Sequence, residues 1–109
     1  DIYVGFNYFI GQEMVCQGDT PLWSMGYAGE VTDPEASREE AGRIYGFLQK
    51  ALGQVTPERP YRGPTILQED EFTYTDHSEG NFDSFWGREE ITRSGVLVYQ
   101  LRYHGGTLR

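Results

Sequence analysis

Two glutamates are the residues of this chain whose types and spacing best suit chemistry. Glu13 and Glu89 hold the same position in two copies of a heptapeptide, F-x-G-x-E-x-[V/I], at 9–15 and 85–91. Strand alternation puts each carboxylate on the face that carries the apolar residues of its motif, which we take as the inner face. Carboxylates in such surroundings are over-represented at functional sites, so the pair could act as acid and base or hold a cationic ligand. Alternatively, each accepts hydrogen bonds from a Tyr hydroxyl or a backbone N–H and locks its hairpin. We favour the locking role, because enzymes seldom need both halves of a repeat to be active.

The other polar candidates have simpler explanations. Asp76-His77-Ser78-Glu79, with Asp83 nearby, matches no zinc or calcium spacing and has the composition of a turn, so we predict a turn and no metal. His104 lies on the polar face of its strand beside Arg102, which indicates a surface histidine, with a ligand contact as the alternative. Cys16 has no neighbouring His or Lys, and no G-x-S-x-G motif occurs. No catalytic residue is assigned.

Aromatic side chains provide a second possibility for binding. The chain holds 8 Tyr, 6 Phe and 2 Trp, and core packing accounts for most of this load. Any excess would line a cleft between the two halves, where a small apolar or cationic molecule could bind. The candidate ligand-binding residues are Glu13, Trp23, Tyr27, Glu89, Tyr99, Tyr103 and His104.

Two hairpins must position these residues, because the repeat continues past the heptapeptide at the same offset of 76 residues. Leu22, Trp23, Met25, Tyr27 and Gly29 correspond to Val98, Tyr99, Leu101, Tyr103 and Gly105. A hairpin with the three-residue loop Gly18-Asp19-Thr20 pairs Val15–Trp23, Glu13–Met25, Gly11–Tyr27 and Phe9–Gly29. A hairpin centred on Gly95 pairs Ile91–Tyr99, Glu89–Leu101, Gly87–Tyr103 and Phe85–Gly105. Each repeated Gly would then face an aromatic ring that covers the hole it leaves in the sheet.

A single helix is predicted at about 34–53. Asp33 can cap its N-terminus, and Pro34 suits the first helical position. Apolar residues recur at three- and four-residue steps from Ile44 onward and form one stripe. Lys50 and Gly53 mark the end.

Strands and one connection account for the rest of the chain. Aromatic and β-branched residues predict one strand at 2–9, irregular at Gly5 and Asn7. Prolines 57, 60 and 64 predict an extended connection, pinned by Tyr61. Further strands are predicted at about 70–77, 82–93 and 96–105.

These elements predict an α+β domain of the order βββ-α-βββ, made of two pseudosymmetric three-stranded antiparallel units. Residues 1–109 would form one domain, with half-repeats at 1–31 and 70–109 joined by the helix and the proline-rich connection. By this symmetry the first unit lacks a helix and most of a strand. We therefore expect the natural protein to extend upstream, or one sheet face to be buried in a partner.

Composition limits the kinds of partner. The net charge is −8, and the single Lys and eight Arg are scattered, which argues against direct nucleic-acid binding. A lone cysteine excludes an intramolecular disulfide framework. No signal peptide opens the chain and no apolar run approaches the roughly 20 residues that span a bilayer, so we expect a cytoplasmic protein without membrane contact.

Five stretches together carry a resemblance to a known family: 3–13, 21–29, 47–52, 59–64 and 98–106. They resemble an uncharacterised bacterial domain family, a domain of unknown function found alone or behind Xre-type helix-turn-helix domains. The resemblance implies a regulatory or sensory role in at least those cases, and members usually begin with a further helix and strand. No established activity or catalytic residue comes with it.

The first hypothesis is therefore a non-enzymatic small-molecule-sensing or protein-interaction module of a bacterial regulatory type. The alternatives are a small enzyme that uses Glu13 with Glu89, or Glu89 with His104, and a structural domain that dimerises through an uncovered sheet face. A small-molecule ligand and a second copy of the chain are the expected partners, and no cofactor is expected.

Overall fold

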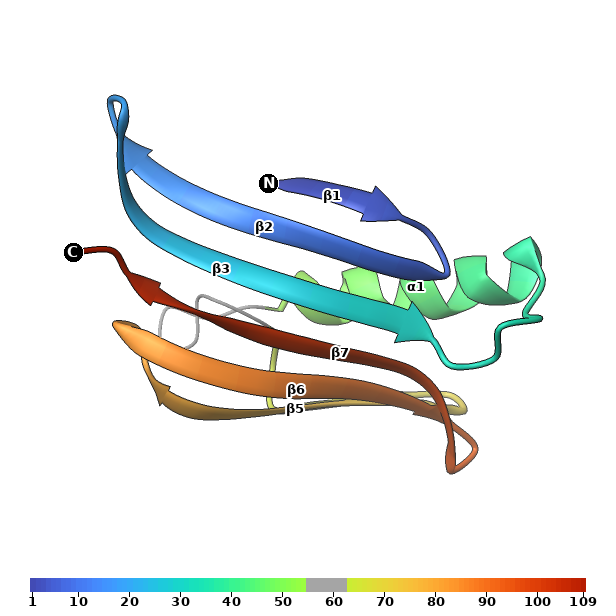
Figure 1. The fold of residues 1–109 in the computed structure, drawn as a ribbon. Coiled ribbons are helices and arrows are strands. Elements are labelled where there is room, and N and C mark those ends of the chain that lie inside the picture. The colour runs from blue at the N-terminus through green and yellow to red at the C-terminus, as the bar shows by residue number, and fades with distance from the viewer. Residues whose placement is uncertain (55–62) are drawn as a thin grey trace.

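One antiparallel sheet and one helix make up the structure, a computed structural model that describes residues 1–54 and 63–109 (Figure 1). The strands are β1 (Ile2–Gly5), β2 (Tyr8–Gln17), β3 (Thr20–Val31), β4 (Ile66–Glu69), β5 (Phe72–Asn81), β6 (Ser84–Arg93) and β7 (Val96–Thr107), and helix α1 (Arg38–Leu52) follows β3. The α+β class is confirmed. The strands form a single 7-stranded sheet in the order β1-β2-β3-β7-β6-β5-β4, not two separate three-stranded units. The two halves are continuous because β3 pairs with β7 from Trp23–Thr107 to Val31–Tyr99.

Both predicted hairpin registers are confirmed. Glu13 pairs with Met25 and Gly11 with Tyr27, while Glu89 pairs with Leu101. Gly87 also lies opposite Tyr103. The loop of the first hairpin is shorter than predicted, because Gln17 pairs with Thr20 and a register shift at Val15/Cys16 takes up the difference.

The prediction of one strand at 2–9 is wrong. Residues 2–9 are two strands, because the chain turns after Gly5, which has a φ of 103° that only glycine adopts without strain. Gly80 has a φ of 92° at the start of the β5–β6 turn. A side chain on either glycine would overlap the backbone of the returning strand.

The short strand β4 was not predicted, and the turn predicted at 76–79 lies inside β5.

Helix α1 begins later than predicted. Ser37 is its N-cap and accepts a hydrogen bond from the Glu40 N–H at 3.1 Å, whereas Asp33 accepts one from the Glu35 N–H in the preceding turn. Lys50 in the last turn and Gly53 at the C-cap are as predicted. The proline-containing connection and Tyr61 lie outside the described residues, except for Gly63 and Pro64.

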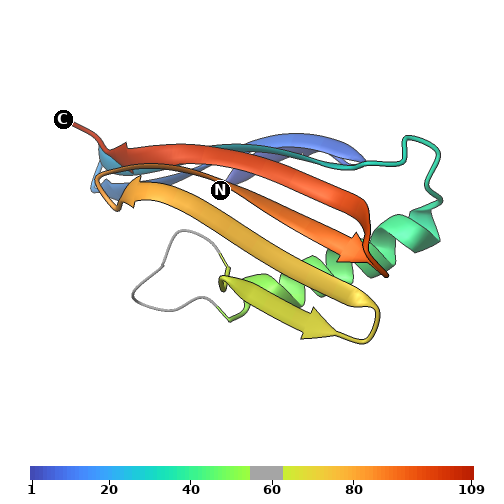
Figure 2. The same cartoon turned by 90° about the horizontal axis from the view of Figure 1, so that it is seen from below.

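The helix covers one face of a curved sheet (Figure 2). Its apolar stripe of Ala41, Ile44, Phe47, Leu48 and Ala51 is buried. The sheet contributes the fully buried Met25, Tyr74, Ile91 and Tyr99, with Leu101 at 1% exposed. Burial of each large apolar side chain stabilises the fold by about 1.5–3 kcal/mol. Within the described residues, no helix has the length and apolar character to cross a bilayer.

Candidate functional site

The carboxylate of Glu89 is fully buried on the inner face of β6. It accepts a hydrogen bond from the Tyr74 hydroxyl at 2.5 Å and another from the Tyr99 hydroxyl at 2.8 Å. A buried charged group is tolerated only when its hydrogen-bonding capacity is used. Glu89 thus has the locking role predicted for it and links three strands of the sheet.

A second buried carboxylate lies directly across the strand pair. Asp76 on β5 pairs with Glu89 on β6 and is 4% exposed. It accepts a hydrogen bond from the Tyr103 hydroxyl at 2.8 Å. The sequence assigned Asp76 to a turn, because its neighbours are turn formers, but the alternation of Tyr74, Asp76 and Ser78 places all three on the inner face.

Glu13 holds the equivalent position of the first repeat but has a different environment. Its side chain is half-buried, and among the described residues its carboxylate has no hydrogen-bond or ion-pair partner. Trp23 stands where the second copy has Tyr99, and its indole Nε1 donates to the Phe82 carbonyl at 3.1 Å. The first copy therefore lacks the hydroxyl that Tyr99 supplies to Glu89.

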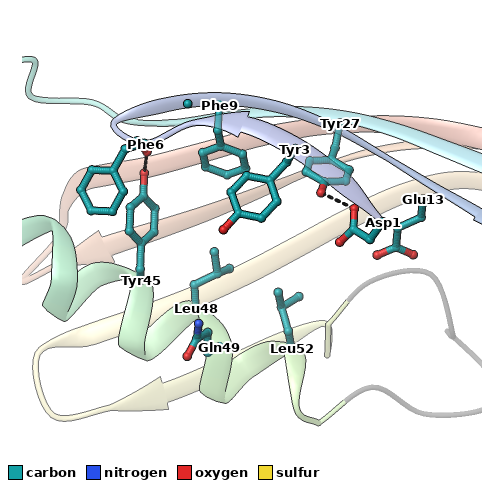
Figure 3. A pocket seen from close by; sticks show the side chains of 11 residues that line it. Asp1, Tyr3, Phe6, Phe9, Glu13, Tyr27, Tyr45, Leu48, Gln49 and Leu52 are labelled. Carbon is teal, nitrogen blue, oxygen red and sulfur yellow. Dashed lines mark hydrogen bonds between the residues drawn. The ribbon is translucent and has the colours of Figure 1, made fainter.

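A pocket of about 420 Å³ opens beside Glu13, between α1 and the inner side of β1 and β2 (Figure 3). Asp1 and Glu13 lie at one end of it, and Phe6 and Tyr45 at the other. Its lining residues are Asp1, Tyr3, Gly5, Phe6, Phe9, Glu13 and Tyr27 from the sheet side, with Tyr45, Leu48, Gln49 and Leu52 from the helix.

Aromatic rings form most of the pocket wall, with Phe9 at their centre. The rings of Tyr3, Tyr27 and Tyr45 meet the Phe9 ring edge-to-face, with centroids 6.0–6.3 Å apart. Tyr99 stacks on Phe9 at 6.4 Å. Edge-to-face pairs are the arrangement that ring quadrupoles favour, so this wall is held in place by its own contacts.

Two of the pocket's polar groups are already paired. The Tyr27 hydroxyl donates to Asp1 Oδ1 at 2.7 Å, and the Tyr45 hydroxyl donates to the Phe6 carbonyl (Figure 3). Burial raises the pKa of the Tyr45 hydroxyl above its ordinary value of 10.0, so Tyr45 remains a neutral donor at physiological pH. Within the described part of the chain, Glu13 is the lining acid whose carboxylate makes no hydrogen bond or ion pair.

The structure separates the residues predicted to bind a ligand. Glu13 and Tyr27 line the pocket, whereas Glu89, Trp23 and Tyr103 are buried in the core. Tyr99 is also buried and reaches the pocket only through its contacts with Phe9 and Tyr45.

His104 lies on the other side of the sheet. It is exposed, and it borders a second, more open depression with Gly26 and Trp86. Glu89 is on the inner face of the neighbouring strand, so Glu89 and His104 do not share a cavity. Glu13 and Glu89 do not share one either, because the pocket is lined by Glu13 alone of the two.

Several pocket residues could not be identified from the sequence. Phe9 belongs to the repeated motif, but Tyr3 and Phe6 were assigned to one continuous strand, and Tyr45 lies beside the apolar stripe of the helix. Among residues 1–54 and 63–109, no group of three His, Cys, Asp or Glu side chains could hold a metal ion. Cys16 is exposed.

Fold and pocket together define an α+β domain built on one antiparallel sheet, with a ligand-sized aromatic pocket between its helix and two strands at one edge. The family model described as "Domain of unknown function (DUF5680)" matches residues 1–108, and the chain belongs to this family. The resemblance to a domain of unknown function is thereby confirmed. No curated protein and no solved structure matches the chain.

Proposed function

We propose that this domain is a non-enzymatic small-molecule-binding module whose ligand occupies the pocket between α1 and β1–β2. The observation that carries the proposal is the difference between the two copies of the repeat. The copy with Glu89 is closed by buried tyrosine–carboxylate hydrogen bonds, whereas the copy with Glu13 borders a pocket.

The dimensions and lining of the pocket support this role. Ligand sites are concave, are lined mainly by apolar and aromatic side chains, have a few polar groups and occupy about 300–1,000 Å³. A volume of about 420 Å³ with one available carboxylate meets this description. The pocket suits a molecule of about the size of an amino acid or a substituted aromatic ring.

An enzyme that uses both glutamates has less support. General acid–base catalysis needs both groups within reach of one substrate, and Glu89 is fully buried behind two tyrosine hydroxyls. The family resemblance to domains that follow Xre-type helix-turn-helix domains favours a sensory role in a bacterial regulator over a catalytic one.

We also infer that β1–β3 and β5–β7 are related by a pseudo-twofold axis between β3 and β7. The strand order, the equal hairpin registers and the left-handed glycines at positions 5 and 80 support this relation. Helix α1 and β4 have no counterpart among the described residues of the first copy.

A pocket-filling substitution tests the proposal. Leu52→Trp would occupy the pocket, and Leu22→Trp is the same change at a position that is 40% exposed on β3. A metabolite library would be screened by the rise in Tm that a bound ligand produces. We expect compounds that stabilise the wild-type protein and Leu22→Trp but not Leu52→Trp. A broad library without any such compound would contradict the proposal.

A second surface favours protein interaction as a further function. Ile2, Val4, Tyr8, Ile10 and Met14 alternate along β1 and β2 on the face away from α1, and each is at least 50% exposed. Apolar surface of this kind commonly marks an interface. We propose that a second copy of the chain covers it. Sedimentation should show a dimer that Ile10→Glu dissociates, and a wild-type monomer at high concentration would contradict this.

A further inference from the structure

We infer that the pocket selects a small organic cation: a primary or quaternary amine that carries an apolar or aromatic group. This inference rests on the proposed function, because it names the chemical class of ligand that the same pocket would take. Its physical basis is an available carboxylate at one end of an aromatic wall.

The charged side chains known to line the pocket are carboxylates. They are Asp1 and Glu13, and within residues 1–54 and 63–109 no Lys, Arg or His side chain lines it. Asp1 already accepts the Tyr27 hydroxyl, while Glu13 is without a partner among the described residues. A cationic ligand would form an ion pair with Glu13 in a half-buried setting, where salt screens the attraction less than at an exposed surface. A primary ammonium would add a charge-assisted hydrogen bond.

The rings offer the second attraction. An ammonium group within about 6 Å of an aromatic face is attracted by the negative charge of that face. The wall already makes one such contact, because the Arg38 guanidinium lies 5.2 Å from the centroid of the Phe6 ring. Tyr3 is 63% exposed and lines the pocket from β1, which pairs with β2, the strand that carries Glu13. A ligand ammonium between Tyr3 and Glu13 would therefore meet a ring and a carboxylate together.

The same groups discriminate against other ligand classes. Among the described lining residues an anion would meet the Glu13 carboxylate and no cationic side chain, and the chain's net charge of −8 would slow its approach. A neutral molecule of equal shape would keep the apolar contacts with Leu48 and Leu52 but would leave Glu13 unpaired. Preference for a cation over its neutral analogue is thus the measurable property.

Three probes of similar shape and different charge test this preference: benzyltrimethylammonium, benzyl alcohol and benzoate. Isothermal titration calorimetry would measure each Kd on the wild-type chain. We expect the cation to bind about tenfold or more tightly than the neutral probe, from one ring contact and one charge pair. Benzoate should bind most weakly, and added salt should weaken binding of the cation alone.

Two matched substitutions assign the preference to the pocket. Glu13→Gln should bring the Kd of the cation to within about threefold of the neutral probe. Glu79→Gln, which removes the same charge from an exposed position on β5, should leave the cation's preference intact. A preference that survives Glu13→Gln would overturn the inference, because it would come from the overall acidity of the chain.

The remaining outcomes separate this inference from the proposed function. If all three probes bind equally and Leu52→Trp abolishes their binding, the pocket binds ligands without charge selection and only the inference fails. If none of the probes binds while neutral compounds from the library do so at this pocket, the inference again fails alone. If neither the probes nor the library gives a pocket ligand, both fail.

Discussion

Glu13 and Glu89 occupy the same position of two hairpins that have the same register, yet their surroundings differ in almost every respect. Glu89 is fully buried and accepts hydrogen bonds from two tyrosine hydroxyls. Glu13 is half-buried at the end of an aromatic pocket, and in the described part of the chain its carboxylate has no partner. The repeat fixes the strand and the face of each carboxylate, while the neighbouring residues decide what it does.

The residues that enclose Glu89 come from the strands on both sides of β6. Tyr99 reaches Glu89 from β7, and the equivalent residue of β3, Trp23, turns its N–H toward the Phe82 carbonyl instead. Tyr74 reaches Glu89 from β5, the neighbour of β6 on the other side from β7. A repeated sequence can thus keep a carboxylate in both copies while one stabilises the fold and the other is available for binding.

The largest expected effect is on stability at Glu89. Glu89→Ala would remove the acceptor of two buried hydroxyls. Each buried group that loses its hydrogen-bond partner costs about 1–3 kcal/mol. Glu13→Ala should change the free energy of unfolding by less than about 0.5 kcal/mol, because its carboxylate has no partner to lose among the described residues. Urea unfolding of both variants measures the difference. Equal losses would show that the two glutamates are structurally alike.

The next largest difference in stability is expected between alanine substitutions of Gly87 and Gly11, the equivalent glycines of the two heptapeptides. A Cβ on Gly87 would overlap the Tyr103 ring and lie 2.8 Å from the His77 carbonyl oxygen, which is backbone and cannot move aside. Gly87→Ala should therefore cost about 1–3 kcal/mol, as overpacking does. The three atoms nearest to a Cβ on Gly11 all belong to the hydroxyl end of the Tyr27 ring, a side chain that lines the pocket. Gly11→Ala should cost less in the same urea titration and should weaken ligand binding, and the opposite order would refute this account.

A smaller difference is expected between the two tyrosines that face these glycines. Tyr103→Phe removes the buried hydrogen bond to Asp76 and should cost about 1 kcal/mol. Tyr27→Phe removes the bond to Asp1 at the edge of the pocket and should cost less, because that bond is only partly buried. Thermal unfolding compares the pair. Similar shifts in Tm would mean that burial does not distinguish these two bonds.

The smallest effect is at high pH and concerns Tyr45. Burial raises the pKa of its hydroxyl above 10.0 in the folded chain, so the unfolded chain loses this proton first as the pH rises. Its contribution to stability is complete below about pH 10 and is lost as the pH passes through the raised value. Ionised tyrosine can be followed by its ultraviolet absorbance as the pH rises. The difference between the wild-type and Tyr45→Phe titration curves should have its midpoint above pH 10. A midpoint at or below pH 10 would show that water reaches the Tyr45 hydroxyl in the folded chain.

Much of the sheet could be predicted because two kinds of signal agreed. The repeat gave the relation between the hairpins, and the glycine–aromatic pairs gave their register, which the pairing of Gly11 with Tyr27 confirms. The early turn at Gly5 was missed because aromatic and β-branched residues run through it without a break. A comparison of the two copies would have revealed the turn. Gly5 and Gly80 are 75 residues apart, whereas Phe9 and Phe85 are 76 apart, so the turn of the second copy is one residue longer.

The pocket could not be predicted in the same way. Its wall depends on where α1 lies across the sheet, and no local pattern in the sequence encodes that position. Glu13 and Tyr27 were identified because they belong to the repeat. Leu48 and Leu52 belong to the helical stripe that was expected only to pack, and Tyr45 lies beside that stripe. Asp76 was misassigned because turn-forming residue types surround it, although its alternation with Tyr74 marked it as an inner residue.

The most direct test of the account is to map ligand binding by NMR on the isotope-labelled chain with benzyltrimethylammonium. The account predicts that the shifted signals cluster on Tyr3, Phe9, Glu13, Leu48 and Leu52, with the surroundings of Glu89 and the outer face unchanged. Shifts centred on Trp86 and His104, or no shifts at millimolar probe, would contradict the claim that the Glu13 copy of the repeat is the one that binds.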